Sequence, residues 1–239
     1  MAGSLKDKTV LVIGRGSGIA RGIALAAREE GANVIVAGRR REALERAYAG
    51  EAAIGTEAVD LTDDASISAL AARVGRVDHI VSTASARARG QIGDLERDQV
   101  RLSFDTKVIG PLMLARAFSS QINEGGSLLI FSGVAAFKIE VGTLAVAITN
   151  AAADTLTRSL AVELAPIRVN AISPGVIDTG AWDALGDERK AAMFAELGQT
   201  NPARRIGGAE DVASAAVLAM TNTFMTGLTI HVDGGERLV

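Results

Sequence analysis

The stretch Val10–Ala24, VLVIGRGSGIARGIA, decides how this chain folds. It begins with an apolar run, passes through Gly14, Gly16 and Gly18, and continues with small and apolar residues. Glycines let a turn run tightly and let the backbone approach a ligand, while the first N–H groups of a following helix attract an anion. A strand, a glycine loop and a helix in this order predict a cradle for the pyrophosphate of a dinucleotide. The alternative is a glycine-rich turn that holds no ligand.

Short apolar runs alternate with longer helical patterns along the rest of the chain. Runs that are apolar on both faces are typical of a buried parallel sheet, and strict alternation with helices indicates a doubly wound fold. We therefore expect one α/β domain over residues 1–239, a Rossmann fold with a mostly parallel seven-stranded sheet and helices on both faces. The expected strands cover residues 9–13, 33–37, 58–59, 79–82, 127–131, 168–172 and 228–232, and the expected helices cover residues 17–30, 42–49, 63–74, 98–121, 143–164 and 209–220.

The least regular part of the chain is a polar segment, helical in pieces, at about residues 180–200. In doubly wound folds an insertion before the last helix lies at the carboxyl edge of the sheet and often covers a ligand. This segment is therefore expected to be a lid over the substrate.

The composition narrows the classes of partner. The net charge is −3 and no block of Lys and Arg stands out, so neither nucleic acid nor an anionic membrane is expected as a partner. The absence of cysteine excludes thiol nucleophiles, thiolate metal sites and disulfides, and no His/Asp/Glu cluster has the spacing of metal ligands. The start of the chain carries charges and no stretch is long enough to span a bilayer, so a cytoplasmic location is expected.

The residues after the second expected strand indicate which dinucleotide binds. A site for NAD places an acid there to hold the ribose 2′-hydroxyl, but this chain has Gly38, followed by Arg39, Arg40 and Arg41. Arg15, in the glycine loop, can reach the same region. Because a guanidinium matches a phosphate with a rigid fork of donors, this pattern favours NADP(H), with Arg39 as the main ligand. Alternatively, these arginines are only the solvated start of a helix.

Together these features resemble the short-chain dehydrogenase/reductase family over nearly the whole chain. IGRGSGIA at residues 13–20 is similar to the family motif TGxxxGIG, and IRVNAISPGVIDT at residues 167–179 is a close match to the family's nicotinamide-flanking segment. TGLTIHVDGG at residues 226–235 matches its last strand, whereas STAS at residues 82–85 replaces its usual NNAG. The resemblance implies a cofactor site made of Gly14, Arg15, Gly16, Ser17, Gly18, Ile19, Arg39, Arg40, Asp60, Leu61, Thr83, Ala84, Ser85, Asn150, Pro174, Gly175, Ile177 and Thr179. Asp60 and Leu61 are expected around the adenine, and Ser17 as a helix cap.

The catalytic positions depart from the family pattern. The family uses Asn, Ser, Tyr and Lys, and the corresponding positions are Lys107, Gly133, Val146 and Asn150. The one tyrosine of the chain, Tyr48, follows the second strand and is expected near the adenosine. Hydride chemistry belongs to the cofactor, but loss of a positioned acid typically costs about 10²–10⁴ in rate. Activity therefore requires a substitute proton donor, or a substrate that needs none.

Lys107 is the first candidate for the substitute donor. The family register points it into the site, where burial would lower its pKa and let it act as an acid or stabilise an oxyanion. Alternatively, its amine reaches solvent or pairs with a carboxylate. Lys138 is the second candidate, with an ordinary surface lysine as its alternative. Ser132 and Asn150 can orient or donate hydrogen bonds, and Asn150 can also bond the nicotinamide ribose.

Three functions follow, and the first is favoured. The chain is expected to be an NADP(H)-dependent oxidoreductase that acts on a small carbonyl, alcohol or imine with a non-standard proton donor. The alternatives are a catalytically inactive NADPH-binding or sensor protein, and a non-redox lyase or isomerase. The Ala-rich helix at residues 151–165 resembles the face through which family members pair, so a homotetramer or homodimer is expected.

Overall fold

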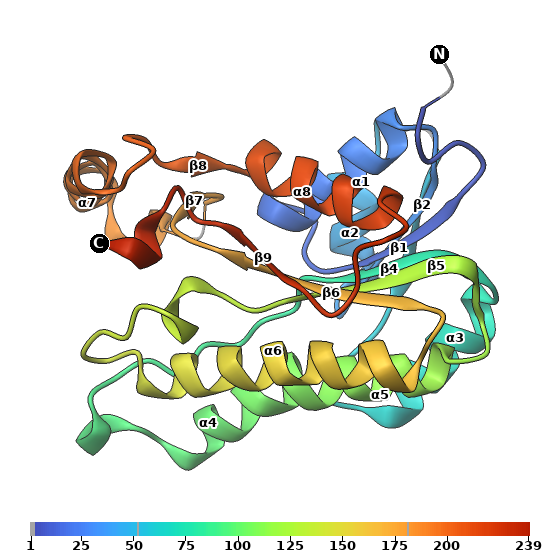
Figure 1. The fold of residues 1–239 in the computed structure, drawn as a ribbon, viewed down its shortest axis with the longest axis horizontal. Helices are drawn as coiled ribbons and strands as arrows, with labels where there is room; N and C mark the ends of the chain where they lie inside the picture. Colours follow the sequence, from blue (N-terminus) through green and yellow to red (C-terminus); the bar gives the residue numbers. More distant parts are fainter. Residues whose placement is uncertain (1–2, 52, 181) are drawn as a thin grey trace.

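The apolar runs form a parallel sheet. The structure is a computed structural model and describes residues 3–51, 53–180 and 182–239. Its seven-stranded sheet has the order β3-β2-β1-β4-β5-β6-β9, with every neighbouring pair parallel (Figure 1). The strands are β1 (Thr9–Ile13), β2 (Asn33–Gly38), β3 (Ile54–Ala58), β4 (Val77–Ser82), β5 (Ile122–Phe131), β6 (Arg168–Pro174) and β9 (Thr229–Val232). This confirms the expected α/β fold of the Rossmann type.

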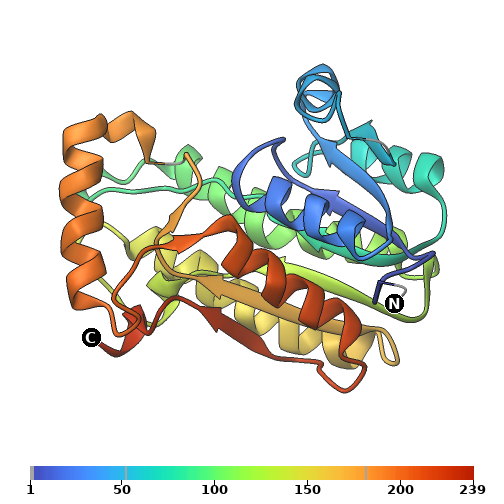
Figure 2. The ribbon, with the colours of Figure 1, turned by 90° about the horizontal axis from the view of Figure 1, so that it is seen from above.

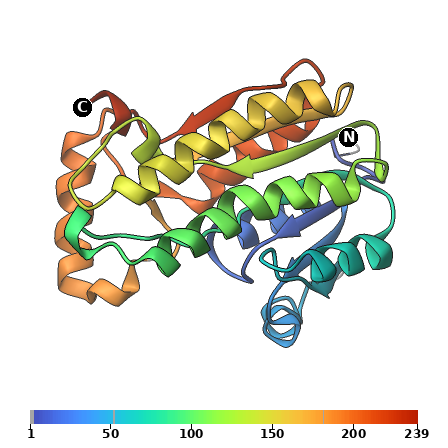
Figure 3. The same ribbon diagram turned by 90° about the horizontal axis from the view of Figure 1, so that it is seen from below.

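Helices cover both faces of this sheet (Figures 1 and 3). One face carries α1 (Gly18–Glu29), α2 (Arg41–Ala47) and α8 (Ala209–Thr221), and the other carries α3 (Asp64–Val74), α4 (Arg97–Phe104), α5 (Gly110–Phe118) and α6 (Leu144–Glu163). Along β1, Val10 and Val12 pack into the core on the α1 side, whereas Leu11 and Ile13 pack on the α5 side. Successive side chains of a strand point to opposite faces, so a strand covered on both faces must be apolar at every position.

Two of the expected elements differ in the structure. The strand expected at residues 58–59 is β3, which begins at Ile54 and lies at the sheet edge, where its polar side chains hide it from a search for apolar runs. The single helix expected at residues 98–121 is two helices, α4 and α5, joined by a π-helical turn at Asp105–Ile109. The spacing of apolar residues does not reveal the π-helical turn. One wide turn rotates the direction of the following side chains but does not end the helix.

The segment before α8 forms a separate layer at one end of the molecule. Strand β7 (Ile177–Asp178) pairs with β8 (Gly207–Gly208), and α7 (Asp187–Thr200) lies between them in the chain. Figure 2 shows α7 standing across the end toward which the sheet strands point. The lid expected at about residues 180–200 falls on this layer, except that residue 181 lies outside the described residues.

Candidate active site

The candidate site lies where two neighbouring strands lead to helices on opposite faces of the sheet. β1 is followed by α1 on one face, while its neighbour β4 leads to α4 on the other face. Such a divergence at the carboxyl ends of adjacent strands opens a crevice, which is where ligands bind in folds of this kind. Within the part of the chain that the structure describes, no helix has the length and apolar character to cross a bilayer, and no group of His, Asp or Glu side chains is arranged to hold a metal ion.

The glycine loop is shaped by close packing. A Cβ atom on Gly14 would lie 2.3 Å from Oγ1 of Thr83, and one on Gly16 would lie 2.5 Å from Cβ of Ala47. Gly18 has a φ of +59°, and its Cβ would lie 2.9 Å from Cβ of Thr179. Packing therefore explains the first two glycines, whereas Gly18 also has the left-handed backbone that starts α1. The structure places this loop beside Thr83 and Thr179, as the expected cofactor site requires.

The Ser17 side chain differs from its expected role. Ser17 is the N-cap residue of α1, but within the described chain its hydroxyl makes no cap hydrogen bond. The first N–H groups of α1 therefore keep their donor capacity for a ligand. An anion at this helix end would be stabilised by those donors and by the helix dipole.

The far end of the crevice brings Arg39 and Asp60 together. Asp60 Oδ1 accepts hydrogen bonds from the backbone N–H of Thr62 at 2.9 Å and from its hydroxyl at 2.8 Å. The backbone bond from Thr62 is the main reason why the pKa of Asp60 is lowered, and the charge of Arg39 contributes. A Cβ on Gly38 would lie 2.6 Å from the carbonyl oxygen of Gly14, so a larger residue would need the glycine loop to move. Leu61 is buried beside this end, whereas Arg39 and Arg40 remain exposed.

Tyr48 lies beside the glycine loop, away from the residues expected to react. A Cβ on Gly16 would lie 3.7 Å from its ring. Burial raises the pKa of Tyr48 to about 12, so its phenol holds its proton at neutral pH.

At the other end of the crevice, the structure brings together three of the four predicted catalytic residues. Lys107 lies on the π-helical turn and only 7% of its surface is exposed. Its Nζ donates to the backbone oxygen of Ser132 at 2.9 Å and to Oδ1 of Asn150. The Ser132 hydroxyl donates to the backbone oxygen of Asn150 at 3.2 Å, and Nδ2 of Asn150 donates to the backbone oxygen of Gly133 at 3.2 Å. Lys107, Ser132 and Asn150 thus form one buried network, which we call the Lys107 cluster.

The lysine of this cluster has an unusual pKa. Burial, and then the charge of Arg87, lower the pKa of Lys107 to about 7, while Asp154 acts in the opposite direction. Both acceptors of Nζ, a backbone carbonyl and an amide oxygen, are neutral, so no carboxylate in hydrogen-bonding contact holds the charge. An ammonium group has three N–H donors and this one uses two, which leaves one for a ligand.

The fourth predicted residue, Lys138, lies apart from the cluster. It is in the loop after β5, with its Nζ 4.0 Å from Oε1 of Glu140. This position fits the surface alternative better than direct participation.

The positions expected for serine and tyrosine border the cluster. A Cβ on Gly133 would lie 2.8 Å from Nδ2 of Asn150, so the glycine leaves room for that amide. Val146 is 6% exposed and carries no donor. The histidines lie on strands: His79 bonds the Ser127 hydroxyl at 2.9 Å in the core, and His231 packs edge-on against Phe137.

Sequence reasoning missed two arginines and a glutamate near the site. Arg87 and Arg89 follow β4. The sequence SARARG at residues 85–90 shows the pair directly after the STAS motif, which was interpreted only as a departure from the family's NNAG. Glu236 is buried near the end of the described chain, and its Oε2 accepts the backbone N–H of Val176 at 2.9 Å. It therefore fixes the loop after β6, which begins at Gly175.

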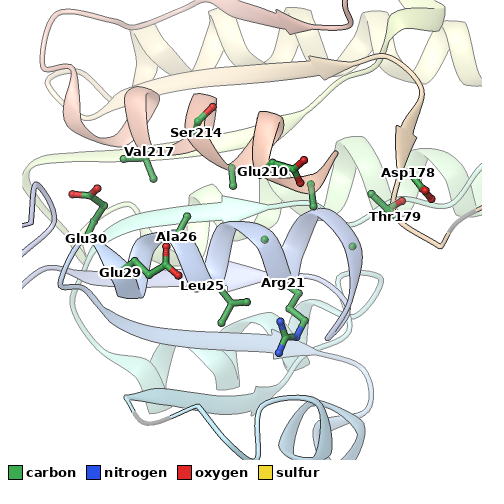
Figure 4. Close-up of a pocket in the computed structure, with 14 residues that line it drawn as sticks. Arg21, Leu25, Ala26, Glu29, Glu30, Asp178, Thr179, Glu210, Ser214 and Val217 are labelled. Atoms are coloured by element: carbon green, nitrogen blue, oxygen red, sulfur yellow. The ribbon is translucent and has the colours of Figure 1, made fainter. Parts of the chain in front are cut away.

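Two cavities of the described structure lie outside the Lys107 cluster. The larger, of about 720 Å³, is a groove between α1 and α8 that reaches the site only at Gly18 and Thr179 (Figure 4). The smaller, of about 230 Å³, lies behind the loop after β6. The candidate site is therefore defined by the residues that converge at the carboxyl ends of the strands and not by a cavity.

The chain is similar to known proteins over nearly its whole length. Residues 13–236 match the family model described as enoyl-(acyl carrier protein) reductase. The short-chain dehydrogenase/reductase ucsE of Acremonium sp is 31% identical, covering 99% of this chain and 98% of that protein. Sorbitol dehydrogenase of Cereibacter sphaeroides is 32% identical, covering 97% of this chain and 98% of that protein. The crystal structure of a small-chain dehydrogenase in complex with NADPH is similar with a TM-score of 0.85 at 31% identity, covering 98% of this chain and 100% of that one.

Proposed function

Because the chain belongs to the short-chain dehydrogenase/reductase family of oxidoreductases, we propose that it is an NADP(H)-dependent enzyme in which Lys107 donates the proton. Its substrate is a small carbonyl compound, an imine or the corresponding alcohol. The observation that carries this proposal is the Lys107 cluster, a buried amine with a pKa near 7 at the carboxyl ends of the strands.

The residues at the crevice suit a dinucleotide with an additional phosphate. The uncapped start of α1 would hold the pyrophosphate, and Arg39 with Arg40 and Arg15 would hold the 2′-phosphate. The tight contact at Gly38 supports this assignment, because it leaves no room for the acid that a ribose 2′-hydroxyl would need. The loop from Pro174 to Thr179 would flank the nicotinamide, which supplies the hydride when the cofactor is bound.

Lys107 then performs the work of a general acid. Its free N–H points to no acceptor of the described chain and would donate to the substrate oxygen. Nζ would give its proton to the substrate oxygen as the carbonyl is reduced to an alcohol, which would leave a neutral amine. The amine recovers a proton from solvent, and a pKa near the working pH suits both steps. Asn150 and Ser132 hold the amine in place.

An inactive cofactor-binding protein is the second candidate, and a specific observation favours it. Neither Gly133 nor Val146 carries a hydroxyl, so a substrate oxygen at the position usual for the family would find no donor there. The two candidates differ in whether NADPH is consumed.

The test is a turnover assay with Lys107→Met. Purified protein is given NADPH with a panel of aldehydes, ketones and imines, and nucleotide oxidation is followed by absorbance. We expect Lys107→Met to lose about 10²–10⁴ in turnover, the usual contribution of a positioned acid, with NADPH affinity little changed. Lys6→Met, at an exposed lysine far from the strand ends, is the matched control.

Three results would count against the proposal. Turnover retained in Lys107→Met would remove the assignment of the donor. NADPH binding without turnover on the whole panel would favour the inactive protein, and no binding of NADPH or NADP⁺ would remove both candidates.

A further inference from the structure

The segment after β4 carries two arginines on one side. Between Ser85 and Arg89 the exposure alternates: Ser85, Arg87 and Arg89 are exposed, Ala86 is half-buried and Ala88 is 1% exposed. Alternation with a period of two is the signature of an extended chain, so the Arg87 and Arg89 side chains leave the same face.

Both ends of this extended segment are anchored. The Ser103 hydroxyl of α4 donates to the backbone oxygen of Ala86 at 2.8 Å, and the backbone N–H of Gly90 donates to the oxygen of Gly142 at 3.1 Å. Gly142 lies just before α6, which carries Asn150. The two arginines are thus held on a fixed span that crosses from the sheet to the entrance of the Lys107 cluster.

The face that carries the arginines is the one toward the crevice. The Arg89 guanidinium carbon lies 5.9 Å from the ring centre of Trp182, in the layer that contains α7. Arg87 lies near enough to Lys107 for its charge to lower the pKa of that amine. Packing around Arg87, and then the charges of Arg89 and Arg15, lower the pKa of Arg87 itself. Its side chain nevertheless stays exposed, so it lies at the protein surface among other cations.

In the described part of the chain, these cations lack a carboxylate in direct contact. Within residues 3–51, 53–180 and 182–239, no ion pair includes Arg87, Arg89 or Lys107. Like charges that converge in a confined site are unfavourable unless an anion lies among them. Arg87, Arg89 and Lys107 therefore form a group of positive charges at the end of the site that holds the Lys107 cluster.

We propose that Arg87 and Arg89 form an anion site at the reacting end of the crevice, and that the substrate is an oxo acid whose carboxylate binds there. This rests on the proposed function and adds the substrate class. Arg87 supplies the planar fork that suits a carboxylate, and Arg89, held against Trp182, couples the anion to the lid. With the carboxylate in place, the oxo group of the same molecule lies within the reach of Lys107.

The test uses the single tryptophan of the chain as its probe. Trp182 fluorescence is titrated, in the presence of NADP⁺, which has no hydride to transfer, with 2-oxobutyrate and with 4-oxopentanoate, which place the carboxylate at two distances from the oxo group. 2-Butanone and 2-pentanone, in which a methyl group replaces the carboxylate, are the neutral counterparts. We expect at least one acid to bind more than tenfold tighter than its neutral counterpart, and Arg87→Ala to weaken that acid on the order of 10–100-fold, as for loss of a charged hydrogen bond.

Two variants separate this site from general electrostatics. Arg87→Lys keeps the charge without the fork and is expected to restore part of the affinity. Arg101→Ala removes an exposed charge from α4 and is expected to leave the acid's affinity within twofold of that of the unmodified protein.

Each outcome has a definite meaning. Equal binding of acids and neutral ketones, or an equal effect of Arg101→Ala, would overturn the anion site. A fall in NADPH affinity in Arg87→Ala, measured without any acid, would assign the arginine to the cofactor pyrophosphate and would also overturn it. Because these are binding measurements, failure of the oxidoreductase proposal appears separately, as acid binding that depends on Arg87 without NADPH consumption.

Discussion

At the scale of the residue, the place of the lysine amine in the folded site matters more for its chemistry than the sequence position that carries the lysine. The family resemblance places an asparagine where Lys107 stands and a lysine where Asn150 stands. In the structure Nζ of Lys107 donates to Oδ1 of Asn150, so the cation occupies the space between the two positions. One exchange of side chains therefore keeps an amine at the same contact while the phenol is missing.

The pKa of Lys107 leads to a prediction about pH. A general acid must be protonated, and burial sets this group's folded pKa at about 7 rather than 10.5. Carbonyl reduction should therefore be constant below about pH 7 and fall about tenfold per pH unit above it. The measurement is kcat for NADPH oxidation across this range, with NADPH affinity measured in parallel as the control. A rate that stays level through pH 9, where a lysine with this pKa is almost wholly neutral, would contradict the role of donor.

At the scale of the element, the contact between the end of β5 and α6 holds the cluster together. Gly133 follows β5, and Asn150 lies in the second turn of α6. Nδ2 of Asn150 donates to the backbone oxygen of Gly133. The π-helical turn between α4 and α5 then brings Lys107 against both. Such turns recur at functional sites because they redirect one side chain without ending the helix.

The β5–α6 contact predicts the effect of restoring the serine. A Cβ at residue 133 would lie 2.8 Å from Nδ2 of Asn150, so Gly133→Ser should lower the free energy of unfolding by about 1–3 kcal/mol, the usual cost of overpacking. Asn150→Ala removes the obstructing amide, so the double variant should be more stable than the sum of the single effects predicts. Urea denaturation of the four proteins measures this coupling, and strictly additive effects would show that the two positions do not compete for space.

At the scale of the whole molecule, α4 and α5 follow each other end to end, and α6 runs alongside them on one outer face (Figure 3). This face exposes large apolar side chains, namely Leu102, Ile109, Leu112, Leu144 and Ile148. Several large apolar side chains exposed on one face favour association with another protein surface. This exposure supports the expected homotetramer or homodimer, which stays a prediction.

Disruption of this face should change the assembly. Ile148→Asp places a charge at an apolar side chain that is 49% exposed on α6, and it should reduce the mass in solution to that of a smaller assembly. Size-exclusion chromatography with light scattering measures the mass, and Lys6→Glu, which changes charge elsewhere, is the control. An unchanged mass in Ile148→Asp would place the contact on another face.

The sequence sufficed for the fold and the glycine loop because those depend on local patterns. The run through Val10–Ala24 predicts a strand, a tight turn and a helix, and the structure has all three. The contact of Lys107 with Ser132 and the span of Arg87 and Arg89 depend on distances between segments far apart in the chain. The π-helical turn and the edge strand β3 were missed because neither leaves a distinctive apolar period.

The contact between Lys107 and Asn150 also limits which combinations of residues are favourable at these two positions. A chain with lysine at both places would bury two ammonium groups against each other, and a chain with asparagine at both would have no cation there. A direct exchange of the two residues, one at a time, passes through one of these arrangements, so we expect the two substitutions to occur together. A classification of such proteins by residue identity at single alignment positions would separate chains whose sites hold the same charge.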